Sequence, residues 1–192
     1  IYNAFVVETE KTGGNPAHIY LDADDLSEDD MKALAEKSEY KDVVFVRKPT
    51  IARAHYKLDY YMAGERTLIS GHPTIAAFAC MHDKLNLEEG AYSIELMNGR
   101  VVYVAYKEGK VYLEQEHPVY EEPAMADIMA IMDATGVTLA DLIPNHMPML
   151  VSATNKSMVV GVKTMDKLKA ISPNFDKLKN ISDELEVIGF IL

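Results

Sequence analysis

The 192-residue sequence contains one cysteine, Cys80, and no tryptophan. A single cysteine excludes an intrachain disulfide, and it cannot supply the several thiolates of a cysteine-based metal site. Cys80 lies within the apolar run from Ile75 to Met81, so we expect a buried structural thiol rather than a nucleophile. This cysteine usage favours a protein of the reducing cytoplasm.

Long hydrophobic runs are also missing. No apolar run approaches the roughly 20 residues that a bilayer-spanning helix needs. The chain does not open with a basic segment followed by an apolar one, as a secretory signal would. The composition, 48% hydrophobic and 26% charged residues, is that of a globular protein with one large or two small domains. We therefore expect no membrane partner.

Positive charge is scarce. The sequence has 19 Lys and Arg residues against 30 Asp and Glu residues, which gives a net charge of -11. An acidic surface of this kind repels nucleic acid and anionic lipid, so we expect neither as a partner. Acidic residues cluster locally at positions 22–30, which we interpret as the solvated start of a helix.

Several motifs of metal, cofactor and hydrolase sites are absent too. The histidines have neither HExxH nor HxH spacing, and the sequence contains no P-loop, no GxGxxG and no GxSxG motif. We therefore expect no metal, no cofactor and no Ser-His-Asp triad. The histidines lie at positions 18, 55, 72, 82, 117 and 146.

Hydrophobic patterning in the first part of the chain predicts strands, two helices and a meander. Ser27 followed by Asp30 predicts a helix start with a capping box. Alternation of Ala54, Tyr56, Leu58 and Tyr60 predicts a strand with one apolar face. Further strands are expected at residues 1–7, 18–21, 43–46, 92–97, 101–106 and 111–113, and a buried helix at about 71–84.

The remaining part of the chain repeats the mixture. We interpret residues 117–123, with two prolines, as a linker or a crossover. Helices are expected at 124–134, 165–170 and 175–181, and strands at 149–152, 157–162 and 185–192. Because strands and helices do not alternate regularly, the fold class is α+β. The chain stops on a hydrophobic strand, so we expect the second domain to be incomplete.

The sequence Gly71-His72-Pro73 opens the apolar helix at 71–84. Proline is favoured at the first helical position, so we expect Pro73 there, with Ser70 or His72 at or just before the cap. A buried helix start offers free N–H groups and the positive end of the helix dipole. The pattern therefore predicts a site for a bound carboxylate or phosphate.

Two other motifs accompany this helix start. The loop Gly13-Gly14-Asn15-Pro16, taken alone, is a turn too short to cradle a phosphate. Asp42 precedes the apolar residues 43–46 and, taken alone, is most simply an exposed strand-end residue. By the same reasoning, His72 alone is most simply a capping or core histidine.

In their order and setting, these motifs resemble the PhzF-like phenazine-biosynthesis family, which shares the diaminopimelate epimerase fold. The resemblance lies in GGNPAHIYLDADDLSEDDMKALAEKSEYKDVVFV at 13–46, in DYYMAGERTLISGHPTIAAFA at 59–79 and, more weakly, in SMVVGVKTMDKLKAISPNFDKL at 157–178. It implies two similar domains, 1–117 and 118–192, each a mixed sheet wrapped around a central helix, with the second domain truncated. The active site of such a protein lies in the cleft between the domains.

The resemblance also implies a function. Family members of this kind are isomerases that move a proton on carbon without a cofactor, so we expect a small carboxylated metabolite as substrate. The family's acid/base is a Glu at the entry of the SE..FV strand, and the aligned residue is Asp42. His72 keeps its family place as a hydrogen-bond donor to the ligand. The expected substrate-binding residues are Asn15, Ser70, Gly71, His72, Pro73 and Thr74.

Several positions depart from the family pattern. Asp42 is one methylene shorter than Glu and follows Lys41 rather than Ser. The family's Thr-Pro is Met62-Ala63, and the acid before the GHP helix is replaced by Arg66. The family's D..TGSA segment has no counterpart. These departures support an alternative: a catalytically impaired family fragment that acts as a binding or structural protein. A second copy would cover its half-cleft, giving a homodimer.

Overall fold

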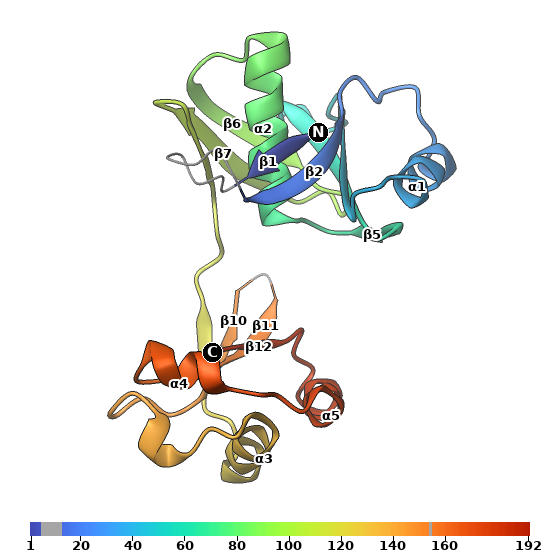
Figure 1. Ribbon diagram of the computed structural model, residues 1–192. Helices are drawn as coiled ribbons and strands as arrows, with labels where there is room; N and C mark the ends of the chain where they lie inside the picture. The colour runs from blue at the N-terminus through green and yellow to red at the C-terminus, as the bar shows by residue number, and fades with distance from the viewer. Residues whose placement is uncertain (5–12, 154) are drawn as a thin grey trace. The chain divides into compact units, whose positions relative to one another are not determined.

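The computed structural model describes residues 1–4, 13–153 and 155–192. The chain divides into two compact units, residues 1–114 and residues 115–192 (Figure 1). Each unit has its own hydrophobic core of strands and helices. None of the helices in the described ranges is long and apolar enough to cross a membrane.

The first unit is one curled sheet with two helices, α1 (Glu28–Glu36) and α2 (Gly71–Leu85). Its strands follow the order β1-β2-β3-β4-β6-β7-β8 across the sheet, and β5 pairs with β4. β2 pairs with β3 in parallel, as β4 does with β6. The strands are β1 (Tyr2–Ala4), β2 (Asn15–Tyr20), β3 (Asp42–Arg47), β4 (Tyr56–Met62), β5 (Glu65–Thr67), β6 (Gly90–Glu95), β7 (Val101–Lys107) and β8 (Lys110–Leu113).

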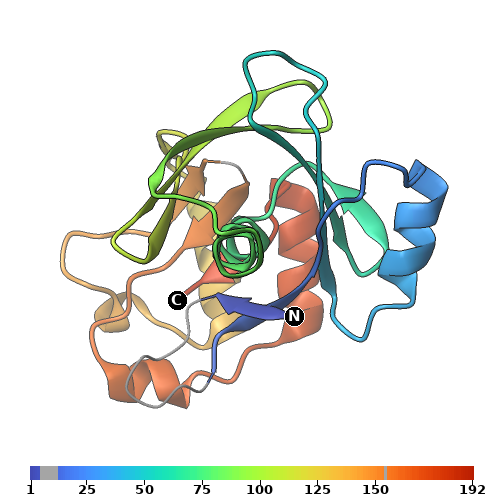
Figure 2. The same cartoon turned by 90° about the horizontal axis from the view of Figure 1, so that it is seen from above.

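α2 lies inside the curl of the sheet, as the view along the helix in Figure 2 shows. Its Phe78 and Met81 pack into a cluster with buried residues of β3, β4, β6 and β7. On another side, Ala76 packs against Ala4 and Ala17 of β1 and β2. Because strands surround the helix, almost every side of it is apolar, which explains a sequence without a clear polar face.

α1 covers the opposite, outer face of the sheet over β3 and β4. Met31 of α1 packs against Val43, Phe45 and Tyr61. Both faces of β3 are therefore buried, which explains the unbroken apolar run at residues 43–46.

The strand predicted from the alternation of residues 54–60 differs from the observed one. β4 begins at Tyr56, and Leu58, Asp59, Tyr60 and Tyr61 are all buried. Alternation alone would leave one face to solvent, but α1 covers that face. The first predicted strand, 1–7, is observed as Tyr2–Ala4, and its residues 5–7 lie outside the described residues.

The predicted helix start at Ser27 is confirmed. Ser27 Oγ accepts a hydrogen bond from the Asp30 amide at 3.1 Å, and Asp30 Oδ2 accepts one from the Ser27 amide at 3.0 Å. Three acidic residues of the 22–30 cluster occupy the first turn of α1, where the helix dipole favours negative charge.

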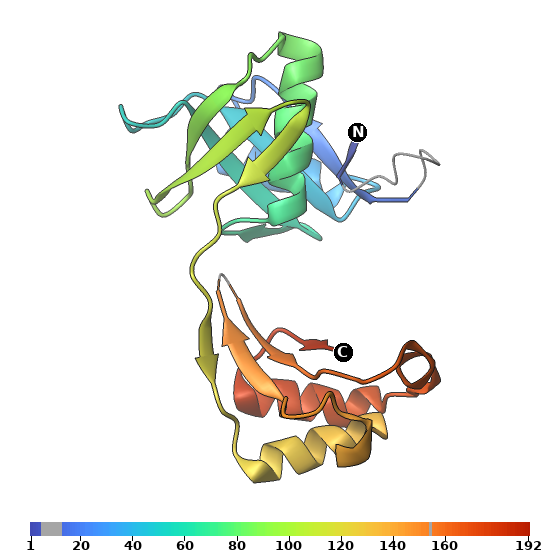
Figure 3. The ribbon, with the colours of Figure 1, turned by 90° about the vertical axis from the view of Figure 1, so that its left-hand side faces the viewer.

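The second unit is a four-stranded sheet in the order β12-β11-β10-β9. Helices α3 (Met125–Thr135) and α5 (Phe175–Leu185) lie on the same face of this sheet (Figure 3). Ile131 and Leu178 of these helices share a core with Leu150 and Met158 of the sheet. The remaining elements are β9 (Val119–Glu121), η1 (Leu139–Asp141), β10 (Met149–Ser152), β11 (Lys156–Val159), α4 (Met165–Ala170) and β12 (Phe190–Ile191).

Three predictions for this unit are corrected. The segment 117–123 is more than a linker, because β9 forms within it and pairs with β10. The strand predicted at 157–162 ends at Val159. The strand predicted at 185–192 is reduced to Phe190–Ile191, because α5 continues to Leu185 and ends on Glu186 with a φ of 52°.

Candidate active site

Strand β3 directs Asp42 toward the start of α2. Asp42 is the first residue of β3 and shares a face with Val44 and Val46, which pack in the core around α2. Alternation along the strand therefore turns its carboxylate to the inner face of the sheet. There, Asp42 Oδ2 lies 3.4 Å from Nε2 of His72. The fold thus brings together the two residues for which a catalytic role was predicted.

Both side chains remain accessible from outside. Each of the two is 19% exposed. Asp42 is therefore more enclosed than a plain strand-end residue, whereas the preceding Lys41 is exposed. A carboxylate and an imidazole in contact, both within reach of a small molecule, can accept and donate protons and hydrogen bonds.

α2 begins at Gly71, with Ser70 as its N-cap residue. Pro73 is thus the third helical residue, and the prediction that it is the first was wrong. The Ser70 side chain makes no capping hydrogen bond, and the first turn has no acidic residue. Proline has no N–H, and the Thr74 amide donates to the Ser70 carbonyl at 3.2 Å. The amides of Gly71 and His72 are therefore the ones that the helix itself leaves unused.

Two buried hydroxyl groups, those of Thr74 and Tyr60, lie between this helix start and β4. Thr74 Oγ1 donates to the Ser70 carbonyl at 2.7 Å, and the Tyr60 hydroxyl lies 2.7 Å from Thr74 Oγ1. Burial raises the pKa of the Tyr60 phenol well above its usual range, so the phenol stays protonated. Sequence reasoning missed Tyr60. The available signal was a tyrosine on the apolar face of a strand, since a buried phenol usually has a hydrogen-bond partner.

Asn15 is the first residue of β2 and lies at the end of the sheet where the parallel strand β3 also begins. β2 and β3 are parallel with His18 opposite Val43, so Ala17 lies level with Asp42 and Asn15 lies two residues further out. Asn15 is exposed. Among the hydrogen bonds of the described residues, none joins Asn15 to Asp42 or His72. The structure therefore places Asn15 at the same end of the strands as Asp42, and the described hydrogen bonds do not join Asn15 to the pair.

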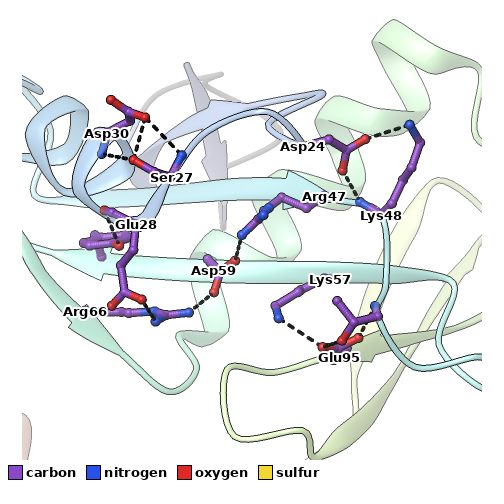
Figure 4. Close-up of polar contacts among 12 residues, drawn as sticks. Asp24, Ser27, Glu28, Asp30, Arg47, Lys48, Lys57, Asp59, Arg66 and Glu95 are labelled. Atoms are coloured by element: carbon purple, nitrogen blue, oxygen red, sulfur yellow. Dashed lines mark hydrogen bonds and ion pairs between the residues drawn. The ribbon is translucent and has the colours of Figure 1, made fainter.

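A second charged cluster occupies the outer face of the sheet (Figure 4). The fully buried Asp59 accepts from Arg66 Nη2 at 2.5 Å and from Arg47 Nη1 at 3.3 Å. Arg66 Nη1 also lies 2.7 Å from Glu28 Oε2 on α1. The arginine that departs from the family pattern is thus the partner of a buried aspartate, and it ties β5 and α1 to β4.

Other chemistry has little support in the described ranges. Within them, no group of three or more His, Cys, Asp or Glu side chains is arranged to hold a metal ion. Cys80 is buried, and this burial raises the pKa of its thiol, which disfavours the reactive thiolate. The groups that can act together are the Asp42 carboxylate, the His72 imidazole and the two helix-start amides.

Proteins with similar sequences are known. The Bacillus subtilis protein named uncharacterized isomerase YfhB is 32% identical over 178 residues, which are 90% of this chain and 59% of that protein. The Salmonella typhimurium protein named uncharacterized isomerase YddE is 25% identical over 194 residues, which are 99% of this chain and 65% of that protein.

Solved structures with a similar fold are also known. The crystal structure of the Bacillus anthracis phenazine biosynthesis protein of the PhzF family matches with a TM-score of 0.76 and 25% identity, covering 90% of this chain and 58% of that one. A predicted epimerase from Pseudomonas aeruginosa shares the fold with a TM-score of 0.70 and 20% identity, covering 92% of this chain and 63% of that one. The α+β, diaminopimelate epimerase-like fold is therefore confirmed.

The chain spans about six tenths of the length of these relatives. The family model for PhzC-PhzF, described as phenazine biosynthesis-like protein, matches residues 2–190. With this match over nearly the whole sequence, the chain belongs to the PhzC-PhzF family.

Proposed function

We propose that this protein is a cofactor-independent isomerase that moves a proton on carbon in a small carboxylated metabolite. One observation carries the proposal: Asp42 Oδ2 lies 3.4 Å from His72 Nε2, at a helix start whose N-cap residue, Ser70, makes no capping hydrogen bond. The relatives named isomerases support the same reaction class.

Substrate binding would use the start of α2. The amides of Gly71 and His72 donate to a substrate carboxylate, and the positive end of the helix dipole adds attraction. The Ser70 hydroxyl, which makes no capping hydrogen bond, can donate to the same carboxylate. Pro73 and Thr74 shape the turn, because proline has no N–H and the Thr74 amide and hydroxyl both donate to the Ser70 carbonyl.

Proton transfer would use Asp42. Its carboxylate removes a proton from a carbon next to the substrate carboxylate or conjugated with it, and the electron pair of the broken C–H bond moves into an enolate. The helix-start amides stabilise the negative charge that develops on the oxygen atoms. The protonated Asp42 then returns the proton to another carbon of the conjugated system, which completes the isomerisation. His72 donates a hydrogen bond to the ligand beside it.

Deuterium incorporation tests this proposal. The protein is incubated in D₂O with a panel of small carboxylic acids that carry a C–H bond next to, or conjugated with, the carboxylate. NMR and mass spectrometry then report exchange at carbon. We expect Asp42→Asn to lower the exchange rate by about 10²–10⁴-fold, the usual contribution of a general base.

The matched control is Asp25→Asn, since Asp25 is an exposed aspartate in the loop before α1. This variant should exchange as fast as the original protein. Exchange that persists unchanged in Asp42→Asn would show that another group is the base. Tartrate binding at the Gly71 and His72 amides, with no exchange of any acid, would instead favour a binding or dimeric structural protein.

A further inference from the structure

We infer that Tyr60 is a positioning residue that, together with Thr74, holds the first turn of α2 beside Asp42. The inference rests on the proposed function, because it concerns the same site. Tyr60 acts indirectly: it contacts the helix start through Thr74 and does not itself act on the substrate.

The connection consists of two short hydrogen bonds in series. Thr74 Oγ1 donates its single proton to the Ser70 carbonyl at 2.7 Å, so the Tyr60 hydroxyl, 2.7 Å away, donates to Thr74 Oγ1. Tyr60 is 1% exposed and Thr74 is fully buried. Water does not compete with these bonds, and losing one would leave a buried polar atom without its partner.

The same pair of strands carries both the base and this hydroxyl. In the register of β3 and β4, Tyr60 lies opposite Val44, and Asp42 precedes Val44 by two residues on the same face of β3. One strand pair and two hydrogen bonds therefore connect the helix start to the strand that carries Asp42, in addition to the direct 3.4 Å contact between His72 and Asp42. Catalysis is sensitive to such placement, since a shift of about 1 Å can cost about 100-fold in rate.

Other side-chain ties at this turn are few. Ser70 makes no capping bond through its side chain, and proline at position 73 removes one amide. Besides the 3.4 Å contact between His72 Nε2 and Asp42 Oδ2, the Tyr60–Thr74 link is the side-chain hydrogen bond that, within the described ranges, joins this first turn to the sheet. Removing it should loosen the Gly71 and His72 amides while the apolar core around α2 stays intact.

The test replaces Tyr60 by Phe, which removes only the hydroxyl group. The matched control is Tyr106→Phe, because Tyr106 is also buried and its ring lies 4.6 Å from that of His82, near the other end of α2. Amide hydrogen exchange is followed by NMR. We expect the Thr74 amide to exchange about tenfold faster in Tyr60→Phe, which equals about 1.4 kcal/mol of local stability, and to stay unchanged in the control.

The second measurement is the turnover number and KM, determined with the carboxylic acid that exchanges deuterium in the panel described above. For Tyr60→Phe and Thr74→Val we expect the turnover number to fall about tenfold, while KM stays within about twofold. Thr74→Ser keeps the hydroxyl group and should recover most of the turnover that Thr74→Val loses. A residue with a merely structural role would lower the melting temperature without this split between turnover and KM.

If Tyr60→Phe behaves like Tyr106→Phe in both measurements, the inference is overturned. Failure of the proposed function gives a different result, in which even the original protein exchanges no acid. In that case the amide measurement decides: faster Thr74 exchange in Tyr60→Phe alone supports the positioning role, and equal exchange overturns it.

Discussion

Glu95 illustrates how a single buried carboxylate fixes a loop. It is 2% exposed and accepts hydrogen bonds from the Thr50 amide and hydroxyl, both at 2.6 Å, and from the Ile51 amide at 3.0 Å. Lys57 Nζ lies 3.1 Å away (Figure 4). Burial by itself would raise the pKa of this carboxyl, but the hydrogen bonds from Thr50, Lys57 and Ile51 outweigh it and lower the pKa to about 2.

At the residue scale we predict that Glu95→Gln lowers the free energy of unfolding by about 3 kcal/mol near pH 7. The folded pKa of about 2 lies below the ordinary value of 4.5, so the unfolded state binds the proton first as the pH falls. The stabilisation is therefore full above about pH 5 and disappears toward about pH 2. Urea unfolding of both proteins near pH 7 and pH 3 measures the difference.

The control for this prediction is Glu88→Gln, since Glu88 is exposed. It should unfold like the original protein at both pH values. An equal loss of stability near pH 3 and pH 7 in Glu95→Gln would contradict the prediction, because the effect would then not depend on the ionised carboxylate.

The sequence identified some residues of the candidate site and not others. Asp42 and His72 were predicted because the resemblance to the PhzF-like family assigns roles to their positions, whereas each residue taken alone was most simply a strand-end or a capping residue. Tyr60 and Asp59 were missed, because a phenol or a carboxylate within a strand does not reveal its partner. Asp59 meets Arg66 only after β5 folds back on β4, and that contact depends on tertiary structure.

At the scale of elements, the start of α2 contrasts with that of α1. Ser27 caps α1 with its side chain, and acidic residues fill the first turn, whereas α2 has neither feature. An uncapped helix start usually lowers stability by about 1 kcal/mol relative to a capped one. Natural proteins accept such a loss at functional sites, and the open helix start is consistent with a place for a bound anion.

We therefore predict that Ser70→Asp stabilises the protein by about 0.5–1 kcal/mol and weakens tartrate binding. The new carboxylate would cap the Gly71-His72 turn and occupy the place of the ligand. Thermal unfolding and an NMR titration with tartrate measure the two effects. Ser27→Ala is the comparison, since it should lower stability and leave tartrate binding unchanged. Unaltered tartrate affinity in Ser70→Asp would contradict an anion site at this turn.

A second prediction at this scale concerns the outer face of the sheet. Asp59→Asn leaves Arg47 and Arg66 facing a neutral amide, so we expect a loss of about 3–5 kcal/mol in unfolding free energy. The control is Glu65→Gln, whose exposed carboxylate lies 3.7 Å from Lys32 Nζ and should matter by less than about 0.5 kcal/mol. Urea unfolding compares the two, and a loss below about 1 kcal/mol for Asp59→Asn would contradict a structural role for this cluster.

Elements with strong local signals could be predicted from the sequence. The capping box at Ser27 and the apolar helix after Ser70 appear where expected. β9 was missed because its three exposed residues become a strand only through pairing with β10. The inner and outer faces of β4 could not be distinguished either, since burial of both depends on two helices from different parts of the chain.

For the whole molecule, the net charge of -11 acts against the ligand that the site is proposed to bind. An anionic metabolite must approach a negative protein before it reaches the short-range attraction of the α2 amides. Salt screens the long-range repulsion, because the Debye length falls from about 30 Å at about 0.01 M salt to about 8 Å at about 0.15 M. Contacts made over a few ångströms are screened less.

We predict that tartrate, a dianion, binds more tightly at about 0.15 M NaCl than at about 0.01 M, and that a monocarboxylate such as acetate gains less. NMR titration of the Gly71 and His72 amides at both salt concentrations measures the change. Weaker tartrate binding at the higher salt concentration would contradict the prediction and show that local positive charge dominates the approach.

The position of α2 inside the curled sheet has a consequence for how the polypeptide acquires its structure. The helix packs against strands that precede it, β1 and β2, and against strands that follow it, β6 to β8. Its contacts therefore join segments far apart along the chain, which slows folding. During synthesis, the apolar surface of α2 is fully covered only when β8 has formed. The nascent first unit should therefore depend on chaperones until residue 113 has emerged.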